Sequence, residues 1–374
     1  MNALITQNLS TLALAVQNKS ASGRGSGKKI DLYGVKKLRE LILELAVWGK
    51  LVAQNPEDEH ATKLLEKIFT EKKRLIKEEG LKTKASEHIS DEDQYLSVPD
   101  TWEYCRLGNL AKFIDYRGKT PIKLQAGIRL ITAKNVRFGY ISLQPEEFIS
   151  EDEYDAWMTR GFPKMGDILF TPEAPLGNVA IIDIQEKFAL AQRAICFQLH
   201  DPSTAPFLKI LLMSPAFQKE LENNATGMTA TGIKASKLKE IPIPIPPLAE
   251  QHRIVAKVDE LMALCDQIEQ QTEASLSAHT TLVENMLATL TSSANAEELK
   301  QNWQRIASHF TTLFTTEVSI DQPDHPATGR DGQAGTPSPQ RRTRRQTAGT
   351  HRRRKSPTGQ RRQNQKAESA AADC

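Results

Sequence analysis

Two polar segments of the chain carry the residue types that contact nucleic acid. Between Arg106 and Arg137 there are eight Lys or Arg residues and one acidic residue, whereas six acidic residues follow between Glu146 and Asp155. A second segment, Thr229–Lys239, combines hydroxyl side chains with lysines. Lys and Arg neutralise phosphates, and Arg or Asn can hydrogen-bond base edges. The DNA-contact candidates are Arg117, Lys119, Thr120, Lys134, Asn135, Arg137, Thr229, Thr231, Lys234, Ser236 and Lys237. A solvated surface is the alternative interpretation of the same charges.

No spacing in the chain predicts catalytic chemistry. Residues 227–236 resemble a phosphate-binding loop, but Ile233 separates the second glycine from Lys234. The four cysteines are scattered, without a CxxC pair or a neighbouring histidine cluster, which argues against zinc and against disulfides and favours a reducing cytoplasm. No apolar run approaches the ~20 residues of a membrane span. We therefore expect a cytoplasmic binding protein that is not an enzyme, with no metal, no cofactor and no membrane association.

The formal net charge of +3 hides two opposite contributions. Residues 321–374 hold 12 Lys or Arg and 5 Asp or Glu, a balance of +7, so the first 320 residues carry 37 basic and 41 acidic residues, a balance of −4. The last 54 residues contain no Ile, Leu, Val, Met, Phe, Trp or Tyr, so they cannot bury a core and we predict that they are disordered. Overall charge therefore gives no support to DNA binding by the folded part.

The polar segments need elements that position them, and the sequence divides into five parts. We predict a flexible leader over 1–28, a helical region over 29–95, a mixed domain over 96–247, helices over 248–320 and a basic tail over 321–374. In the helical region, apolar residues at three- and four-residue steps predict one helix from about Asp31 to Trp48 and a second from Asp58 or Glu59 to Glu79.

The mixed domain contains short apolar runs bounded by Gly, Pro and Asn. These predict strands over Ile128–Thr132, Tyr140–Leu143, Asp167–Phe170, Val179–Asp183 and Ala194–Leu199. One short helix is predicted over Pro206–Asn223. The prolines of Ile241–Pro247 exclude a helix there and predict an extended segment.

A heptad pattern predicts a long helix from about Leu248 to Leu290, followed by a shorter one over Ala296–Phe314. The apolar seam consists of Ile254, Val258, Leu261, Cys265, Ile268, Leu282 and Met286. We favour packing of this seam within the chain, for example against the Leu38–Trp48 helix. Docking of another subunit is the second interpretation.

Two sequence blocks resemble the specificity (S) subunits of type I restriction-modification systems. The first runs from Leu41 to Val52 and continues with Gln54, Pro56 and Asp58-Glu59; the second runs from Gly232 through the prolines to Gln251 and Ile254. Three shorter motifs, Tyr116–Pro121, Ala133–Val136 with Gly139, and Gly166–Leu169, are similar to motifs of that family's target-recognition domains. The resemblance covers roughly residues 30–320.

This resemblance implies an α+β protein with one strand-rich target-recognition domain, flanked by conserved helices that include a long coiled-coil-like helix. The implied function is non-catalytic: such a subunit reads one half of a split double-stranded DNA target and docks methyltransferase (M) subunits, and motor-nuclease (R) subunits complete the complex. The seam residues would then belong to the docking helices. This chain departs from the family because it has one recognition domain where two are usual.

The codons of the tail could encode a second copy of the N-terminal helical block in another reading frame. Back-translated from His325 and read one nucleotide later, its codons permit a sequence that matches Ile42–Ala61 at fourteen of twenty positions. The following codons can recover Lys63, Leu64, Leu65, Glu66 and Ile68. We hypothesise a frameshift between about Ser319 and His325. The alternative is an arginine-rich arm that grips DNA phosphates without sequence choice.

The sequence thus predicts a one-domain specificity subunit, whose copies could pair through the conserved helices with two-fold symmetry. Two other interpretations remain open. One is a folded but non-functional remnant of such a subunit, and the other is a helical scaffold without DNA specificity. Co-purification with an M subunit separates them.

Overall fold

In the computed structural model the described residues are 17–18, 30–79, 89–116, 120–191, 193–227 and 231–314. The predicted leader lies outside them except at Gln17–Asn18, which forms strand β1 and pairs antiparallel with β2, Ile30–Asp31. The predicted tail over 321–374 also lies outside the described residues. Residues up to Ile306 form one compact unit, and a second unit begins at Ala307.

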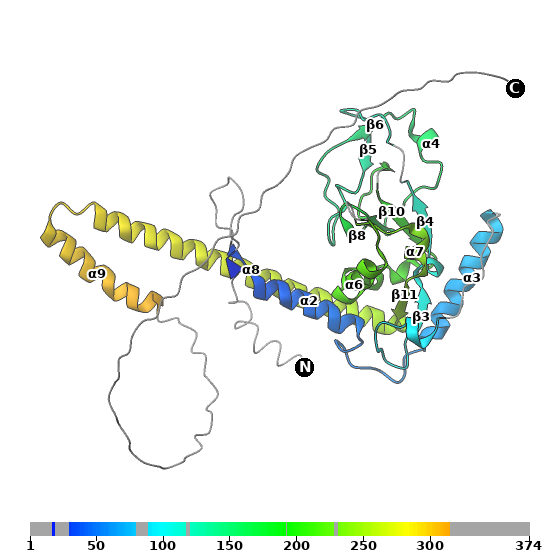
Figure 1. The fold of residues 1–374 in the computed structure, drawn as a ribbon, viewed down its shortest axis with the longest axis horizontal. Helices are drawn as coiled ribbons and strands as arrows, with labels where there is room; N and C mark the ends of the chain where they lie inside the picture. Colours follow the sequence, from blue (N-terminus) through cyan, green and yellow to red (C-terminus); the bar gives the residue numbers. More distant parts are fainter. Residues whose placement is uncertain are drawn as a thin grey trace, which may run out of the picture. The chain divides into compact units, whose positions relative to one another are not determined.

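Helix α2, Tyr33–Val47, lies along the first half of α8, Leu248–Thr291, as Figure 1 shows. Both helices follow the predicted bounds to within two residues. Apolar residues at three- and four-residue steps give α2 one continuous buried face, which includes Val35, Leu38 and Ile42. Beside this face, Arg39 pairs with Asp266 at 2.6 Å and Glu269 at 2.8 Å on α8.

The α8 seam is divided between two environments. Ile254, Val258, Leu261 and Cys265 are at most 5% exposed and share one core with α2, and Ile268 packs partly buried against that core. This confirms the predicted intramolecular packing. It also corrects the assignment of these four residues to subunit docking, because the chain's own core already covers them. Further along α8, Met286 is buried while Leu282 is 39% exposed.

Helix α3, Ala61–Glu79, begins after a loop and packs on β3, Glu103–Arg106. Strand β3 pairs antiparallel with β11, Pro242–Ile245. The Ile241–Pro247 segment is therefore extended as predicted, but it is also a buried strand. Two prolines are tolerated in β11 because β3 is its only neighbour in this sheet, so the missing N–H groups break no second ladder.

A four-stranded antiparallel sheet is the centre of the middle domain. Its strand order is β4, Ala111–Asp115; β10, Ile195–Leu199; β7, Ile168–Pro172; and β8, Leu176–Ile181. Alternate residues face opposite sides, so Ile168 and Phe170 join the core shared with the helices, whereas Leu169 joins a second core. Helices α5, Ala205–Met213, and α6, Pro215–Asn224, contribute to the first of these cores.

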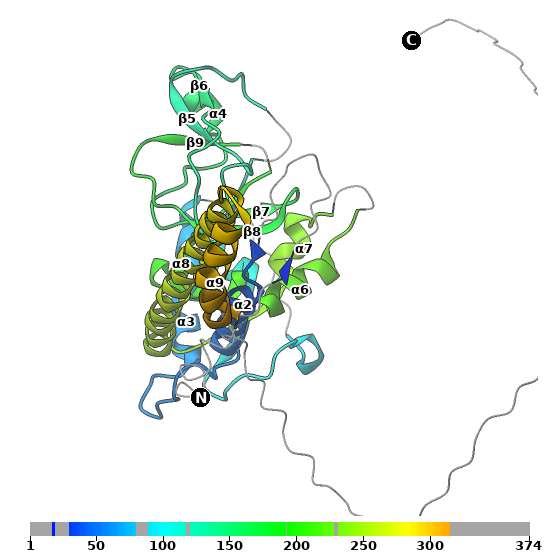
Figure 2. The same ribbon diagram turned by 90° about the vertical axis from the view of Figure 1, so that its left-hand side faces the viewer.

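The second core lies between this sheet and a three-stranded sheet. In that sheet β5, Ile128–Ile131, pairs antiparallel with β6, Phe148–Ile149, and parallel with β9, Phe188–Leu190. The short helix α4, Tyr154–Trp157, packs beside it. In Figures 1 and 2 this sheet is at the top, on the side of the four-stranded sheet away from α2 and α8.

The structure contains strands β3, β4, β6 and β9, which were not predicted from the sequence, and it differs from the predicted elements at two further places. Tyr140–Leu143 forms no strand and contributes only an isolated bridge between Val136 and Ile141. The predicted Pro206–Asn223 helix is two helices, because the extended backbone of Ser214 ends α5 and its hydroxyl accepts the Phe217 N–H to cap α6. The boundaries near 95 and 247 stay sequence-based divisions, since one core cluster contains residues on both sides of each.

Among the described residues, the elements still to be given are three single-turn 3-10 helices and the helices α7 and α9. The 3-10 turns are Asp91–Asp93, Leu107–Asn109 and Pro202–Thr204. Helix α7 is Ala235–Glu240, and α9 is Ala296–Phe314, as predicted. Among the described residues, no helix is both long and apolar enough to span a bilayer.

The contact between α2 and α8 can be tested with two adjacent residues. Ile42 is 1% exposed and its neighbour Leu41 is 41% exposed. We expect Ile42→Ala to lower the free energy of unfolding by about 2–5 kcal/mol through lost burial and a cavity. The control Leu41→Ala should change it by less than ~0.5 kcal/mol. Urea denaturation of the full chain measures both, and equal effects would contradict the packing described.

Candidate nucleic-acid interface

The loop over residues 132–145 is built around a buried amide. Asn135 is 1% exposed, and its Oδ1 accepts the Thr132 backbone N–H at 3.0 Å and the Thr132 hydroxyl at 3.1 Å. Its Nδ2 donates to the carbonyl oxygens of Ser142 at 3.0 Å and Pro145 at 3.1 Å. These four bonds use the whole hydrogen-bonding capacity of the side chain. Asn135 therefore holds the loop instead of presenting its amide to DNA, which corrects its assignment as a contact residue.

The same loop is attached to the edge strand β8. The Gly139 N–H donates to the Val179 carbonyl at 2.8 Å, and Asn178 Nδ2 donates to the Val136 carbonyl at 2.9 Å. Gly139 has a φ of +100°, and a Cβ there would lie 3.0 Å from the Met213 side chain. The positive φ favours glycine here, whereas the contact with the flexible end of the Met213 side chain could be relieved by a small movement.

What the loop leaves exposed is a cationic and aromatic tip. Lys134 and Arg137 are exposed, Phe138 is 46% exposed and Tyr140 is 62% exposed. A turn holds them together, since the Arg137 N–H donates to the Tyr140 carbonyl at 2.9 Å. We call these four residues the loop tip. The sequence prediction missed Phe138 and Tyr140, although exposed aromatic rings beside cations are suited to stacking on bases.

The second polar segment, described from Thr231 to Lys239, contacts the β7–β8 hairpin, to whose strand β8 the first loop is attached. The Ile233 N–H donates to the Pro172 carbonyl at 2.9 Å, and Gly232 bridges to Glu173. The buried Ile233 thereby fixes the start of α7, where Thr231, Lys234, Ser236 and Lys237 are all exposed. The hairpin thus positions both polar segments, one on β8 and the other at the end of β7, as the ribbons of Figure 2 illustrate.

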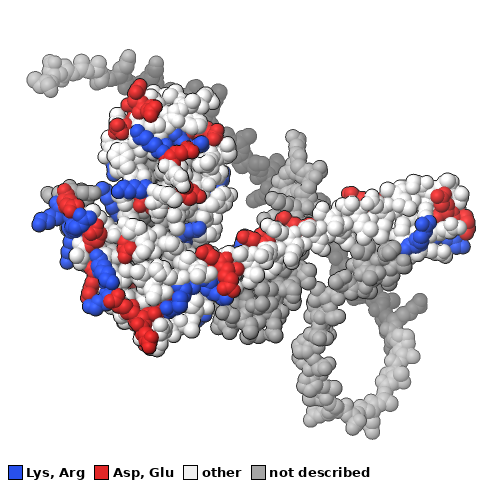
Figure 3. All heavy atoms as spheres, turned by 180° about the vertical axis from the view of Figure 1, so that it is seen from behind, with Lys and Arg blue, Asp and Glu red and all other residues white. Residues whose placement is uncertain are grey.

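The basic stretch is partly neutralised in three dimensions. Arg129 pairs with Glu146 at 3.1 Å and Lys123 with Glu147 at 2.8 Å, so the acidic run following in sequence folds back on the basic one. Arg106 lies 3.5 Å from Glu240. On the face shown in Figure 3, basic and acidic side chains are interspersed over the strand-rich part.

The candidates fall into three groups. Within the described residues, Lys134, Arg137, Lys234 and Lys237 have no ion pair. Thr120 is also exposed. Arg117, Lys119 and Thr229 lie outside the described residues. Of the described candidate contact residues, the exposed cations without an ion pair therefore lie in the loop tip and at the start of α7.

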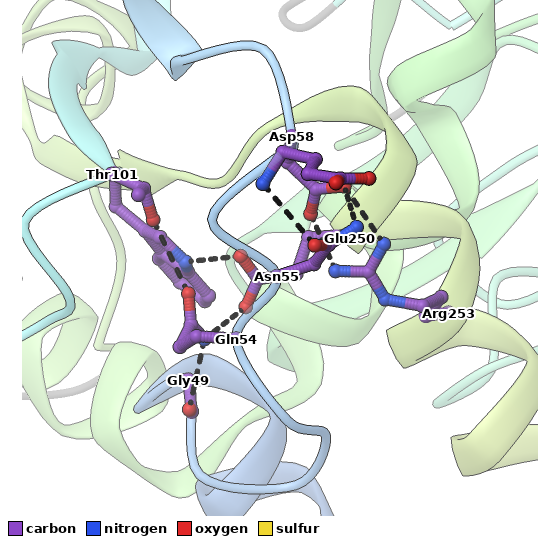
Figure 4. A network of polar contacts seen from close by, with 9 residues as sticks. Gly49, Gln54, Asn55, Asp58, Thr101, Glu250 and Arg253 are labelled. Atoms are coloured by element: carbon purple, nitrogen blue, oxygen red, sulfur yellow. Dashed lines mark hydrogen bonds and ion pairs between the residues drawn. The ribbon is translucent and has the colours of Figure 1, made fainter.

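A separate polar network joins the N-terminal helical region to the first turns of α8 (Figure 4). Glu250 is 1% exposed, and its two carboxylate oxygens accept from Gln54 Nε2 at 2.6 Å and from Trp102 Nε1 at 3.0 Å. One turn later, Arg253 donates to both carboxylate oxygens of Asp58, at 3.1 and 2.5 Å. The two sequence blocks that carry the family resemblance are thus in direct contact.

The pKa values of the two carboxylates in this network are shifted in opposite directions. Burial raises the pKa of Glu250, against the hydrogen bonds from Gln54 and Trp102. Hydrogen bonding from Arg253 lowers the pKa of Asp58, against the opposing effect of burial. The network is a structural joint, because both of its acids are fully engaged with other parts of the chain.

The described residues also show why cysteine chemistry is not favoured. Burial raises the pKa of Cys105 to about 12 and raises that of Cys265, and Cys196 is buried in the second core with its pKa well above the usual value. Such thiols are poor nucleophiles at neutral pH. Nowhere in the described part of the chain do three or more His, Cys, Asp or Glu residues cluster as metal ligands.

Comparison with known proteins gives the chain a family. A model described as the type I restriction modification DNA specificity domain matches residues 99–278. The specificity subunit of type I restriction enzyme EcoAI from Escherichia coli is 38% identical over 341 residues, which cover 85% of this chain and 55% of that protein. The EcoEI specificity subunit from Escherichia coli is 38% identical over 331 residues, covering 85% and 54%. The chain belongs to the type I specificity subunits.

This specificity-subunit chain spans about half the length of the curated relatives it matches. The matched range, 99–278, contains both polar segments, Trp102 and the first turns of α8. A crystal structure of an HsdS subunit from Thermoanaerobacter tengcongensis is 18% identical, with a TM-score of 0.37 over 74% of this chain and 66% of that one.

The raised pKa of Glu250 predicts how the stability of the protein changes with pH. A folded-state pKa above the unfolded value of about 4.3 means that stability is lost as pH rises through the folded pKa. We expect the stability of the wild type relative to Glu250→Gln to fall as pH rises from the unfolded value of about 4.3 through the raised folded pKa. Asp58→Asn is the control, because its lowered pKa puts its transition below about pH 3.9. Its difference from the wild type should stay constant over the same range in urea titrations.

The buried amide of the loop predicts a second stability effect. Asn135→Ala leaves the Thr132 N–H and two carbonyl oxygens without their partner, so we expect a loss of about 1–3 kcal/mol in unfolding free energy. The adjacent exposed Lys134→Ala should stay within ~0.5 kcal/mol of the wild type. Thermal and urea unfolding measure both, and an unchanged Asn135→Ala protein would show that the loop does not depend on this residue.

Proposed function

We propose that this chain is a non-catalytic DNA-reading subunit that recognises one half of a split target and docks methyltransferase subunits, with motor-nuclease subunits completing a restriction complex in the cytoplasm. The observation that carries the proposal is the loop tip. It places two unpaired cations and two exposed aromatic rings on a turn that Asn135 and β8 hold rigidly. Family membership supplies the class of function, and the names of the curated relatives supply the restriction context.

Preorganisation supports a specific contact over general attraction. A fixed loop loses little conformational entropy on binding, so a larger part of the contact energy appears as affinity. The start of α7 presents Lys234 and Lys237 from the same β7–β8 hairpin, which would let two segments grip one duplex. The surrounding surface is electrostatically mixed, so we assign DNA binding to these local cations and not to a broad basic field.

Docking is assigned to the distal half of α8 and the start of α9. Leu282, Leu287, Leu299 and Trp303 are 39–56% exposed there. On the face displayed in Figure 3 this helical pair carries few charged side chains except at its tip, where acidic and basic side chains gather. Exposed apolar side chains on a charge-poor helical surface are typical of protein–protein contact. A methyltransferase subunit is the proposed occupant, and pairing with a second copy of the chain is the alternative.

The loop tip is tested by removing its two cations. We expect Lys134→Ala with Arg137→Ala to weaken binding to a fluorescent duplex of arbitrary sequence. It should also reduce the slope of log K against log salt by about 2, since each phosphate contact contributes about 0.9. Fluorescence anisotropy over a salt series measures this, with the chain bound to its methyltransferase subunit.

The control double variant is Lys73→Ala with Lys77→Ala on α3. Both lysines are exposed, and the net charge changes by the same amount. An equal reduction in slope for both double variants would mean that the effect is one of net charge. That result would contradict a phosphate contact at the loop tip.

The docking surface is tested by placing a charge in it. Because burial of an unpaired carboxylate is costly, we expect Leu287→Glu to weaken association with the methyltransferase subunit by roughly tenfold or more. Leu143→Glu, at a leucine of similar exposure in the recognition domain, is the control. Pull-down gives the loss, and light scattering of the complex reports whether one or two copies of this chain are present. Undiminished association of Leu287→Glu would refute docking at this surface, whereas absence of association for the wild type as well would favour the scaffold interpretation.

A further inference from the structure

Read one nucleotide later, the codons of the tail can encode a sequence that resembles the end of α2, the following loop and α3. Two adjacent codons fix most of the triplet that starts one nucleotide later, so a protein sequence restricts what the shifted frame can encode. Thr328-Gly329, for example, permits only Leu, Pro, Gln or Arg in that frame. A long match to a specific sequence is therefore a demanding condition.

The match continues well beyond Ile68. With His325 aligned to Ile42 and no gap, the shifted triplets run in register as far as Gln365, which aligns with Lys82. Over the added part they permit Glu71, Lys72, Arg74, Leu75, Lys77, Glu78 and Lys82. The counterpart thus covers the end of α2, the loop and all of α3.

The structure supplies an independent check, which is burial. Between Ile42 and Ile68 ten residues are buried, and the shifted triplets can spell all ten. These are Ile42, Leu43, Leu45, Ala46, Val47, Leu51, Ala61, Leu64, Leu65 and Ile68. Positions that cannot be matched, such as Trp48, Asn55 and Glu57, are exposed or half-exposed. An apolar residue alone is a weak test, because the middle base of most shifted triplets is free. The stronger test is the identity of the residue: the fixed outer bases permit Leu at the five buried leucines and Ile, Ala or Val at the other five buried positions, each in register.

The residues that join the helical region to α8 are recovered as well. Gln54, which bonds the buried Glu250, and Asp58, which pairs with Arg253, are both permitted at their aligned positions. A segment spelled by the shifted frame would therefore carry the ten buried residues between Ile42 and Ile68 and the two loop side chains that contact α8 in this structure. Its partner would be a second α8-type helix with Glu and Arg in its first turns.

We propose that the DNA encoding residues 325–366, read one nucleotide later, is a second copy of the segment from Ile42 to Lys82, and that residues 325–374 are its out-of-frame translation. The basic composition of the tail is then a by-product of the frame. The inference concerns the gene and does not rest on the proposed DNA-reading function.

The nucleotide sequence tests this at silent positions. Leucine in the shifted frame requires thymine as the third base of six codons, those of Pro326, Thr328, Ala334, Thr347, Ala348 and Thr358. Any base there encodes the present protein, so the tail as translated places no demand on them. We expect thymine at five or all six and a shifted frame that stays open beyond codon 374. Thymine at four or fewer, or a stop in the shifted frame before codon 366, overturns the proposal.

A protein experiment tests it further and separates it from a functional basic arm. Three genes are expressed: the present one, one with a stop codon at Gln322, and one with a single nucleotide deleted between codons 319 and 325. The corrected gene should give a chain with more helix by circular dichroism than the truncated chain. Removal of the tail should leave DNA affinity and its salt dependence unchanged. A tail whose loss lowers both would instead be a functional arm, whatever the loop-tip variants show.

Discussion

The buried carboxylate of Glu250 is the constraint on which the arrangement of this chain depends. A charged group held at 1% exposure is costly unless every oxygen is bonded, and its bonds come from Gln54 and Trp102, which lie about 150–200 residues earlier in the chain. Satisfying Glu250 therefore requires the loop after α2, the start of the recognition domain and the head of α8 to meet at one point. The adjacent pair of Arg253 and Asp58 sets their relative orientation.

From this joint the core extends without interruption. One face of α2 and the first half of the α8 seam share their apolar residues with one face of the four-stranded sheet, so the sheet is held against the helices. The opposite face packs on the three-stranded sheet. The edge strand β8 then carries the loop over residues 132–145, and its hairpin partner β7 carries the start of α7. The packed core thus fixes the positions of two surface segments, the loop tip and the start of α7.

The structure also changes how charge in this chain is interpreted. The basic stretch and the acidic run are separate in sequence but paired in space, through Arg129 with Glu146 and Lys123 with Glu147. Pairing of this kind leaves an electrostatically mixed surface, which suits recognition through local contacts better than general polyanion binding. The seam of α8 is divided in the same way: its first four residues are buried in the core shared with α2, whereas in its distal part Met286 is buried and Leu282 is exposed.

The sequence by itself determined the elements whose signals are local. The three- and four-residue periodicity of α2 and α8, the helix over Ala296–Phe314 and the exclusion of a helix by the prolines before Leu248 all follow from near neighbours in the chain. The family blocks identified the class of protein for the same reason. Only the tertiary structure decided which polar residues are available. Asn135 was predicted to contact DNA, but four hydrogen bonds within its own loop occupy its amide. Phe138 and Tyr140 had no predicted role at the surface, and the turn leaves both exposed. Burial and pairing depend on residues distant in sequence, and no local pattern records them.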